Sequence, residues 1–251
     1  MDLNADVGES FGAWVMGDDA GVLESVTSAN VACGFHAGDP RVMERTVALC
    51  ARKGVALGAH PGFHDLRGFG RRPLSVEPAE IEADVLYQIG ALGAFAHAFG
   101  FPLTHVKPHG ALYNQAAADE ALAAAIARAV ARFDAGLALV GLAGSETMRR
   151  AAADAGLRFA AEAFADRRYE ADGTLVSRKL AGALLCDPRE IAEQALMIAR
   201  DGVARARDGS LVRLAADTLC VHGDTTGAAD SARAVRAALQ SAGIALRPLS
   251  A

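Results

Sequence analysis

The chain has 251 residues, a length that a single barrel-type α/β domain commonly fills. Hydrophobic residues make up 52% and charged residues 22% of the sequence, which is typical of a globular protein and argues against disorder. The formal net charge of -5 offers no case for a concentrated basic face, so we expect no nucleic acid partner.

Membrane and secretory classes are also disfavoured. The chain opens with Met1 and acidic or polar residues, without the basic start and apolar stretch of a secretory signal. No apolar run approaches the roughly 18 residues that span a bilayer. We therefore expect no membrane contact and a cytoplasmic location, in which the four widely spaced cysteines are free thiols in small buried positions.

Short β-rich runs alternate with longer Ala-, Leu-, Arg- and Glu-rich segments, which predicts repeated βα units and a parallel sheet. In chain order, we expect strands over residues 2–7, 28–33, 55–59, 103–107, 137–141, 158–162 and 217–222. We expect helices over residues 39–53, 77–99, 116–133, 144–155, 188–206 and 226–242. Asp39-Pro40 and Asp187-Pro188 each supply an N-cap followed by proline at the first helical position.

The organisation of these elements predicts one domain over residues 1–251, because the sequence has no linker, charge block or fixed-period repeat. A closed α/β barrel of about seven or eight strands is favoured, since the alternation persists and no dinucleotide fingerprint is present. An open doubly wound sheet is the alternative.

The first expected strand places its polar residues on one side. Strict alternation in DLNADVGE points Asp2, Asn4 and Asp6 away from the apolar side chains between them. In a barrel that side faces the lumen, where a carboxylate costs several kcal/mol unless charge, hydrogen bonds or metal compensate. Asn4 and Asp6 are therefore candidate site residues, although at a surface edge the same row would be merely solvated. Glu9, just beyond, is either a site residue or an ordinary loop carboxylate.

Four of the seven histidines stand at or just beyond expected strand ends, each with glycine within two residues: His36, His60, His109 and His222. The C-terminal ends of parallel strands are where α/β folds build their sites, so we expect these four to converge. A single histidine there would more often be structural. We interpret His64 as a loop residue at the surface, His97 as a residue on a helix face and His105 as a strand residue.

Several charged or polar residues accompany these histidines. Lys107, one of only three lysines, can supply a cation to an oxyanion, with a partly buried ion pair as the alternative. Asn114 could bind substrate or cap the next helix. Asp166 and Arg167 lie in a charged segment that is either a substrate-binding loop or an ordinary solvated loop. Asp224 could orient His222 or cap a helix.

Absent motifs narrow the chemistry. The sequence contains no G-x-x-x-x-G-K-[ST] loop for ATP, no G-x-G-x-x-G, no H-E-x-x-H and no G-x-S-x-G. What remains is acid/base or metal-assisted work on a small polar substrate. A divalent metal would have Asp6, His36 and His60 as candidate ligands from separate strands.

Seven segments in order closely resemble the LamB/YcsF family: DLNADVGESFGAW, ANVACGFHAGDP, GAHPGFHDLRGFGRR, HVKPHGALYN, EAFADRRY, LVSR and CVHGD. The resemblance runs from Met1 to near Gly243, and motifs of this length are highly specific. One departure is His64, where the family often has proline, and it concerns only that loop.

The resemblance implies a seven-stranded β/α barrel like those of the glycoside hydrolase and deacetylase superfamily. It also implies the A subunit of an ATP-dependent 5-oxoprolinase, which converts 5-oxo-L-proline to L-glutamate with ATP as co-substrate. Subunits B and C are the implied partners. Because this chain lacks a P-loop, the nucleotide would be handled by a partner.

With that role in mind, we expect Asp6 to be a general base or metal ligand, histidines to position water or metal, and Lys107 to stabilise an oxyanion. The expected catalytic residues are Asp6, His36, His60, Lys107, His109 and His222, and the expected substrate-binding residues are Asn4, Glu9, Asn114, Asp166, Arg167 and Asp224. The alternatives are a stand-alone metal-dependent amidase or sugar deacetylase and a non-catalytic substrate-binding subunit. Self-association into a homo-oligomer stays open.

Overall fold

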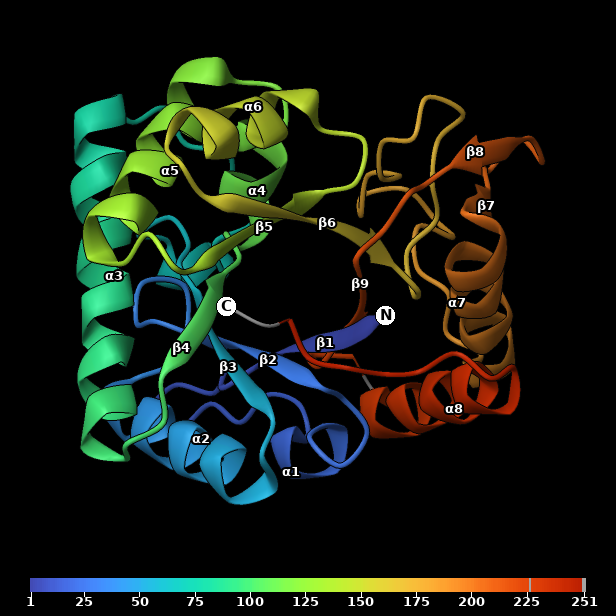
Figure 1. Ribbon diagram of the computed structural model, residues 1–251, viewed down its shortest axis with the longest axis horizontal. Helices are drawn as coiled ribbons and strands as arrows, with labels where there is room; N and C mark the ends of the chain where they lie inside the picture. Colours follow the sequence, from blue (N-terminus) through green and yellow to red (C-terminus); the bar gives the residue numbers. More distant parts are fainter. Residues whose placement is uncertain (226, 250–251) are drawn as a thin grey trace.

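Seven parallel strands close into a barrel in the computed structural model, which describes residues 1–225 and 227–249. Their order is β1-β2-β3-β4-β5-β6-β9, and Figure 1 shows the ring they form. The strands are β1 Asp2–Val7, β2 Ser28–Ala32, β3 Ala56–His60, β4 Leu103–Val106, β5 Ala138–Leu142, β6 Arg158–Phe164 and β9 Thr218–His222. The closed barrel confirms the favoured fold class, and the open-sheet alternative is wrong.

Helices cover the outside of the barrel (Figure 1). In the described residues they are α1 Asp19–Val22, α2 Pro40–Lys53, α3 Pro78–Ala98, α4 Gly110–Ala116, α5 Glu120–Phe133, α6 Glu146–Asp154, α7 Pro188–Asp201 and α8 Ala228–Ser241. The two predicted Asp-Pro starts are confirmed, because Asp39 accepts hydrogen bonds from the amides of Arg41 and Val42, and Asp187 accepts one from Arg189.

Several expected helix boundaries differ from the structure. The helix expected over 188–206 ends at Asp201, because Gly202 takes a left-handed conformation, and Val203–Arg205 forms β7, paired with β8 Leu211–Arg213. The helix expected from residue 116 begins at Glu120, where Asp119 caps the amide of Leu122. The helix expected over 226–242 begins at Ala228, and residue 226 lies outside the described residues.

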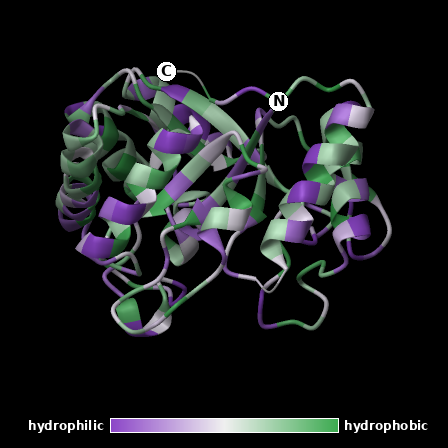
Figure 2. Cartoon of the chain, turned by 90° about the horizontal axis from the view of Figure 1, so that it is seen from below, coloured by the Kyte–Doolittle hydropathy of each residue, from purple (hydrophilic) through white to green (hydrophobic). Residues whose placement is uncertain are grey.

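The two ends of the barrel differ in what covers them. Figure 2 shows both termini at one end and long loops at the other. Leu249 closes the end where the strands begin, packing with Ala138, Val140 and Ala160 while its amide donates to Ser28 Oγ. The loops that follow the strands therefore stand at the open end, which we call the mouth.

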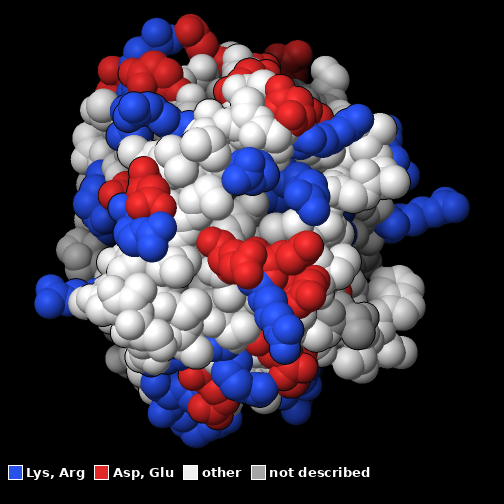
Figure 3. Space-filling model, turned by 90° about the vertical axis from the view of Figure 1, so that its right-hand side faces the viewer, with Lys and Arg blue, Asp and Glu red and all other residues white. Residues whose placement is uncertain are grey.

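Some surface features bear on the sequence-based expectations. All four cysteines are free thiols, as predicted, but Cys186 is exposed rather than buried. No helix in the described part of the chain is long and apolar enough to cross a membrane. On the side formed by α7 and α8, acidic and basic side chains are interspersed (Figure 3). Two ion pairs lie within these helices, Arg200–Asp201 in α7 and Arg233–Asp230 in α8.

Candidate active site

The polar row of β1 lies in the barrel lumen, as the alternation predicts. Asp2 accepts hydrogen bonds from the hydroxyls of Thr27, Ser28 and Thr218 at 2.5–2.7 Å, which satisfies both of its carboxylate oxygens. One layer higher, Asn30 donates to Asn4 Oδ1 and Asp6 Oδ1 at 2.7 and 2.9 Å. The same alternation therefore builds both a floor around Asp2 and a higher layer that orients Asp6.

At the mouth, four buried side chains from the ends of β1, β2, β3 and β4 form what we call the histidine cluster: Glu9, His36, His60 and His109. The rings of His36 and His109 stack with centroids 3.7 Å apart. Glycine makes room for them, because a Cβ on Gly70 would lie 2.7 Å from His109 Cδ2 and 2.8 Å from His36 Cβ. Gly70, a loop glycine more than two residues from any histidine in the sequence, thus makes room for the stacked rings of His36 and His109.

His60 and His109 each direct a nitrogen lone pair toward the space between them. His60 Nδ1 lies 2.7 Å from the Lys107 carbonyl, and His109 Nε2 lies 2.8 Å from the Phe69 carbonyl. A carbonyl only accepts, so both of those nitrogens carry protons. In neutral rings, His60 Nε2 and His109 Nδ1 are then both acceptors, yet they lie 2.9 Å apart. A proton or a metal cation must relieve their repulsion, and carbonyl-anchored imidazoles are typical of metal ligands.

The spacing of the other donors also fits a metal. Bonds of about 2.0–2.2 Å in tetrahedral geometry place neighbouring ligand atoms about 3.4 Å apart. Glu9 Oε1 lies 3.4 Å from His36 Nε2 and 3.5 Å from His109 Nδ1. Among the described residues, Glu9 Oε1 and both ring nitrogens of His36 have no hydrogen-bond partner. The histidine cluster could therefore hold a divalent metal, with His36 and His60 among the predicted ligands.

Beside it, Lys107 binds two carboxylates in what we call the lysine cluster: Asp6, Lys107, Glu162 and Cys220. Lys107 Nζ lies 2.8 Å from Asp6 Oδ1, 2.8 Å from Glu162 Oε1 and 3.2 Å from Cys220 Sγ. Burial lowers the pKa of Lys107, but the carboxylates raise it by more, so the net pKa lies well above its usual value. Burial raises the pKa of Asp6, but His60 and Lys107 together bring it well below its usual value.

A second group of side chains also lies close enough together to hold a metal: Asp6, Cys220 and His222. The ammonium already lies within 3.2 Å of the Asp6 and Cys220 donor atoms. Lys107 itself supplies the positive charge there, so the histidine cluster is the better candidate metal centre.

His222 is oriented by Asp166. Its Nδ1 lies 2.9 Å from both Asp166 oxygens, and its ring stacks on Phe164 with centroids 5.3 Å apart. Burial raises the pKa of Asp166, but His222 lowers it by more, so the carboxyl stays ionised. One prediction was that Asp224 orients His222. Asp224 instead pairs with Arg71 at 2.7 Å. That prediction was wrong because the end of β6 supplies the nearer carboxylate.

Two predicted substrate-binding residues have other contacts. Asn114 is exposed in α4 and donates to the Gly110 carbonyl of its own helix. Arg167 is buried next to Asp166 and donates to the Val176 carbonyl at 2.6 Å. His64 and His97 are exposed, in line with their predicted surface roles.

Two interior residues are absent from the predicted site residues. Glu162 binds Lys107 Nζ from β6, and His105 Nε2 lies 2.8 Å from Asn30 Oδ1 in the middle of the lumen. The available signal was alternation, since His105 shares a strand face with Lys107 two residues on. Treating His105 as an ordinary strand residue overlooked that face.

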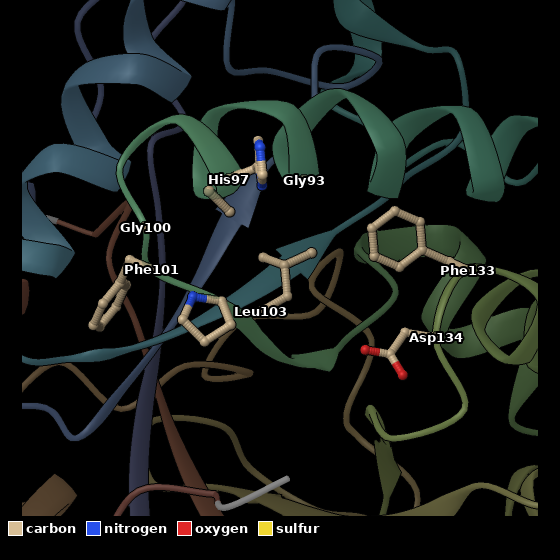
Figure 4. A pocket seen from close by; sticks show the side chains of 9 residues that line it. Gly93, His97, Gly100, Phe101, Leu103, Phe133 and Asp134 are labelled. Atoms are coloured by element: carbon tan, nitrogen blue, oxygen red, sulfur yellow. The ribbon is translucent and has the colours of Figure 1, made fainter.

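A separate surface pocket lies at the opposite end of the barrel. It measures about 350 Å³ and is lined by the end of α3, the start of β4 and the end of α5. Figure 4 shows Phe101, Leu103 and Phe133 around it, with His97 and Asp134 at its edges. This pocket offers few convergent polar groups, so the chemistry is concentrated at the mouth.

The fold and the site together define a β/α-barrel protein with a metal-type histidine cluster and a buried lysine at the mouth. The LamB/YcsF family model matches residues 1–251, and the chain belongs to that family. It is 59% identical to a 5-oxoprolinase A subunit from Chloroflexus aggregans, over 98% of this chain and 98% of the relative. One from Paracidovorax citrulli is 57% identical, over 100% of this chain and 99% of the relative.

A solved structure supports the same assignment. A lactam utilization protein from Thermus thermophilus is 50% identical, with a TM-score of 0.92, covering 100% of this chain and 99% of that one. The barrel described above is therefore the fold of this family.

Proposed function

We propose that the chain is the A subunit of an ATP-dependent 5-oxoprolinase, which opens the ring of 5-oxo-L-proline to give L-glutamate while ATP yields ADP and phosphate. The names of the two relatives and of the Thermus protein support this substrate class. The observation that carries the proposal is the buried mouth, where the histidine cluster adjoins an Asp6 carboxylate held by Lys107. That arrangement suits addition of water to an amide carbon.

The chemistry begins with a stabilised amide. Transfer of a phosphoryl group from ATP to the lactam oxygen would turn the ring carbon into a better electrophile. Water then adds to that carbon, the C–N bond breaks, and the nitrogen gains a proton to leave as an amine. The resulting acyl phosphate takes a second water to give L-glutamate and phosphate. Because the sequence has no P-loop, we assign nucleotide binding to partner subunits B and C.

The residues of this chain divide the proton transfers between them. Asp6 Oδ1 is held by Lys107 and Asn30, while Oδ2 faces His60 at 3.5 Å, so Asp6 is assigned to accept the proton of the attacking water. His222, oriented by Asp166, is assigned to protonate the leaving nitrogen. Lys107 Nζ already binds two carboxylates, so we assign it to holding Asp6 in place rather than to an oxyanion.

A divalent metal fits the histidine cluster by the lone-pair and spacing arguments above. Glu9, His36, His60 and His109 would hold it, and N and O donors of this kind suit zinc and other first-row metals. When bound, such an ion would polarise the substrate oxygen and lower the pKa of a bound water.

The test is glutamate formation from 5-oxoproline and ATP, first with this chain alone and then with subunits B and C. We expect product only in the complete mixture. Asp6→Asn should reduce turnover by about 100-fold or more while circular dichroism stays native. Asp201→Asn, an exposed carboxylate on α7, serves as the matched control with normal turnover. Near-normal activity of Asp6→Asn would contradict the assigned base.

A second candidate is a stand-alone metal-dependent amidase or deacetylase, which the histidine cluster favours because metal hydrolases need no nucleotide. Hydrolysis of 5-oxoproline or an N-acetyl sugar by the metal-loaded chain without ATP would support it. A non-catalytic binding subunit would instead retain function in the complete assay after loss of both Asp6 and Lys107.

A further inference from the structure

Three arginines lie in loops that follow strands of the barrel at the mouth: Arg71, Arg167 and Arg178. Arg71 follows Gly70, which packs against both His36 and His109, and its guanidinium lies 4.7 Å from the Phe69 ring centroid. Arg167 follows Asp166, the residue that orients His222. Arg178 lies two residues beyond Val176, whose carbonyl accepts a hydrogen bond from Arg167.

The charges of these arginines are unevenly compensated. Arg71 pairs with Asp224 at 2.7 Å. Across residues 1–225 and 227–249, neither Arg167 nor Arg178 has a carboxylate within the 4.0 Å of an ion pair, and Arg167 Nε has no hydrogen-bond partner. Arg167 is only 6% exposed, so its charge is largely removed from water. A buried cation without a counter-ion is costly, which indicates that an anion completes this site.

The pKa values of these groups agree with that charge balance. Burial, followed by the neighbouring Arg178, lowers the pKa of Arg167 to about 10. Burial and Arg71 also lower the pKa of Arg178, although Asp224 and Asp166 act in the opposite direction. An incoming anion would relieve this mutual repulsion between guanidinium groups.

We propose that Arg167 and Arg178, flanked by Arg71, form a phosphoryl-binding subsite at the mouth, beside His222 and the histidine cluster. Guanidinium groups match the oxygens of phosphate in a bidentate manner. Two cations without a carboxylate at ion-pair distance favour a dianion, whereas 5-oxoproline itself carries one carboxylate. This inference rests on the proposed function: the subsite would hold the phosphoryl group of the activated lactam beside the carbon that water attacks.

The backbone around the subsite is fixed before any ligand arrives. Gln194 of α7 lies with its amide nitrogen 3.0, 2.9 and 2.8 Å from the carbonyls of Phe164, Ala165 and Arg167. The buried Tyr169 hydroxyl accepts a hydrogen bond from the Phe164 amide at 2.6 Å. Such support positions Arg167 in advance, as preorganised binding requires.

The test measures binding of inorganic phosphate to the purified full-length chain by calorimetry, with EDTA present so that no metal binds the anion. We expect phosphate to bind, and Arg178→Met to weaken it by about tenfold or more. Lys179→Met removes the same charge from the next, exposed residue and should bind phosphate normally. Arg167→Met is the second variant, and Arg178, being half-buried, carries the test if that variant misfolds.

Further arms identify the source of the phosphoryl group. Acetate should not compete with phosphate, because a monoanionic carboxylate matches the subsite poorly. If a non-hydrolysable ATP analogue binds and Arg178→Met weakens that binding, the subsite is supported and its ligand is a nucleotide. If the chain binds phosphate but not the analogue, the ligand is the activated lactam or the released phosphate. No phosphate binding, or equal binding by Arg178→Met, would overturn the proposal, whatever the oxoprolinase assay gives.

Discussion

The floor and the mouth of the barrel are both buried and both polar, yet they differ in whether their polar atoms have partners. At the floor, Asp2 accepts hydrogen bonds from three hydroxyls, so this layer needs nothing from outside. At the mouth, atoms of Glu9, His36 and Arg167 have no hydrogen-bond partner among the described residues. Because buried polar groups are normally satisfied, we assign a structural role to the floor and propose that the mouth binds ligands.

Removing Lys107 should have the largest effect on stability, because this residue is paired with two buried carboxylates. Lys107→Met leaves Asp6 and Glu162 as uncompensated buried carboxylates, and breaking such a pair costs about 3–5 kcal/mol. We expect this loss in the free energy of unfolding by urea denaturation. The double variant with Glu162→Gln should recover part of it. An unchanged unfolding free energy in Lys107→Met would show that the two carboxylates do not depend on this cation.

Divalent metal should stabilise the mouth and leave the floor unaffected. An ion at 100 times its Kd adds about 2.7 kcal/mol to the unfolding free energy, which a thermal melt with Zn²⁺ or Mn²⁺ can detect. Glu9→Gln should lose most of this gain without destabilising the metal-free protein, because Glu9 Oε1 has no hydrogen bond to lose. If wild type and Glu9→Gln gained equally, the histidine cluster would not be the metal centre.

The sequence could predict the fold and the floor better than the mouth. Strand alternation alone placed Asp2, Asn4 and Asp6 in the lumen, and each barrel strand ends within two residues of its expected bounds. The carboxylate that holds His222 depends on how β6 and β9 pair, which is a long-range contact that local sequence does not encode. The β7–β8 hairpin was hidden because helical residues continue up to Gly202.

Asp2→Ala should cost stability without affecting the mouth. It leaves three hydroxyls to find new partners, and each buried polar group that stays unsatisfied costs about 1–3 kcal/mol. We expect the unfolding free energy to fall by about 2 kcal/mol while the metal-induced stabilisation persists. Loss of the metal response in Asp2→Ala would instead mean that floor and mouth are coupled.

At neutral pH the smallest expected effect is that of His105, which lies between the two layers and lowers the stability of the fold only in acid. Burial, followed by Lys107 and other nearby cations, lowers the pKa of His105 to about 3, against about 6.5 when unfolded. Between these values the unfolded chain binds the extra proton, so stability falls as the pH falls, by up to about 1.4 kcal/mol per pH unit. His105→Gln removes this contribution.

The measurement is the difference in unfolding free energy between wild type and His105→Gln across pH 4–8. Contributions from distant, exposed histidines such as His64 and His97 are common to both proteins and cancel in that difference. The difference in unfolding free energy should not change with pH above about 6.5, the pKa of the unfolded histidine. As the pH falls below that value, wild type should lose stability relative to His105→Gln. A flat difference throughout would mean that His105 takes up its proton in the folded state, so that the middle of the lumen tolerates charge as the mouth does.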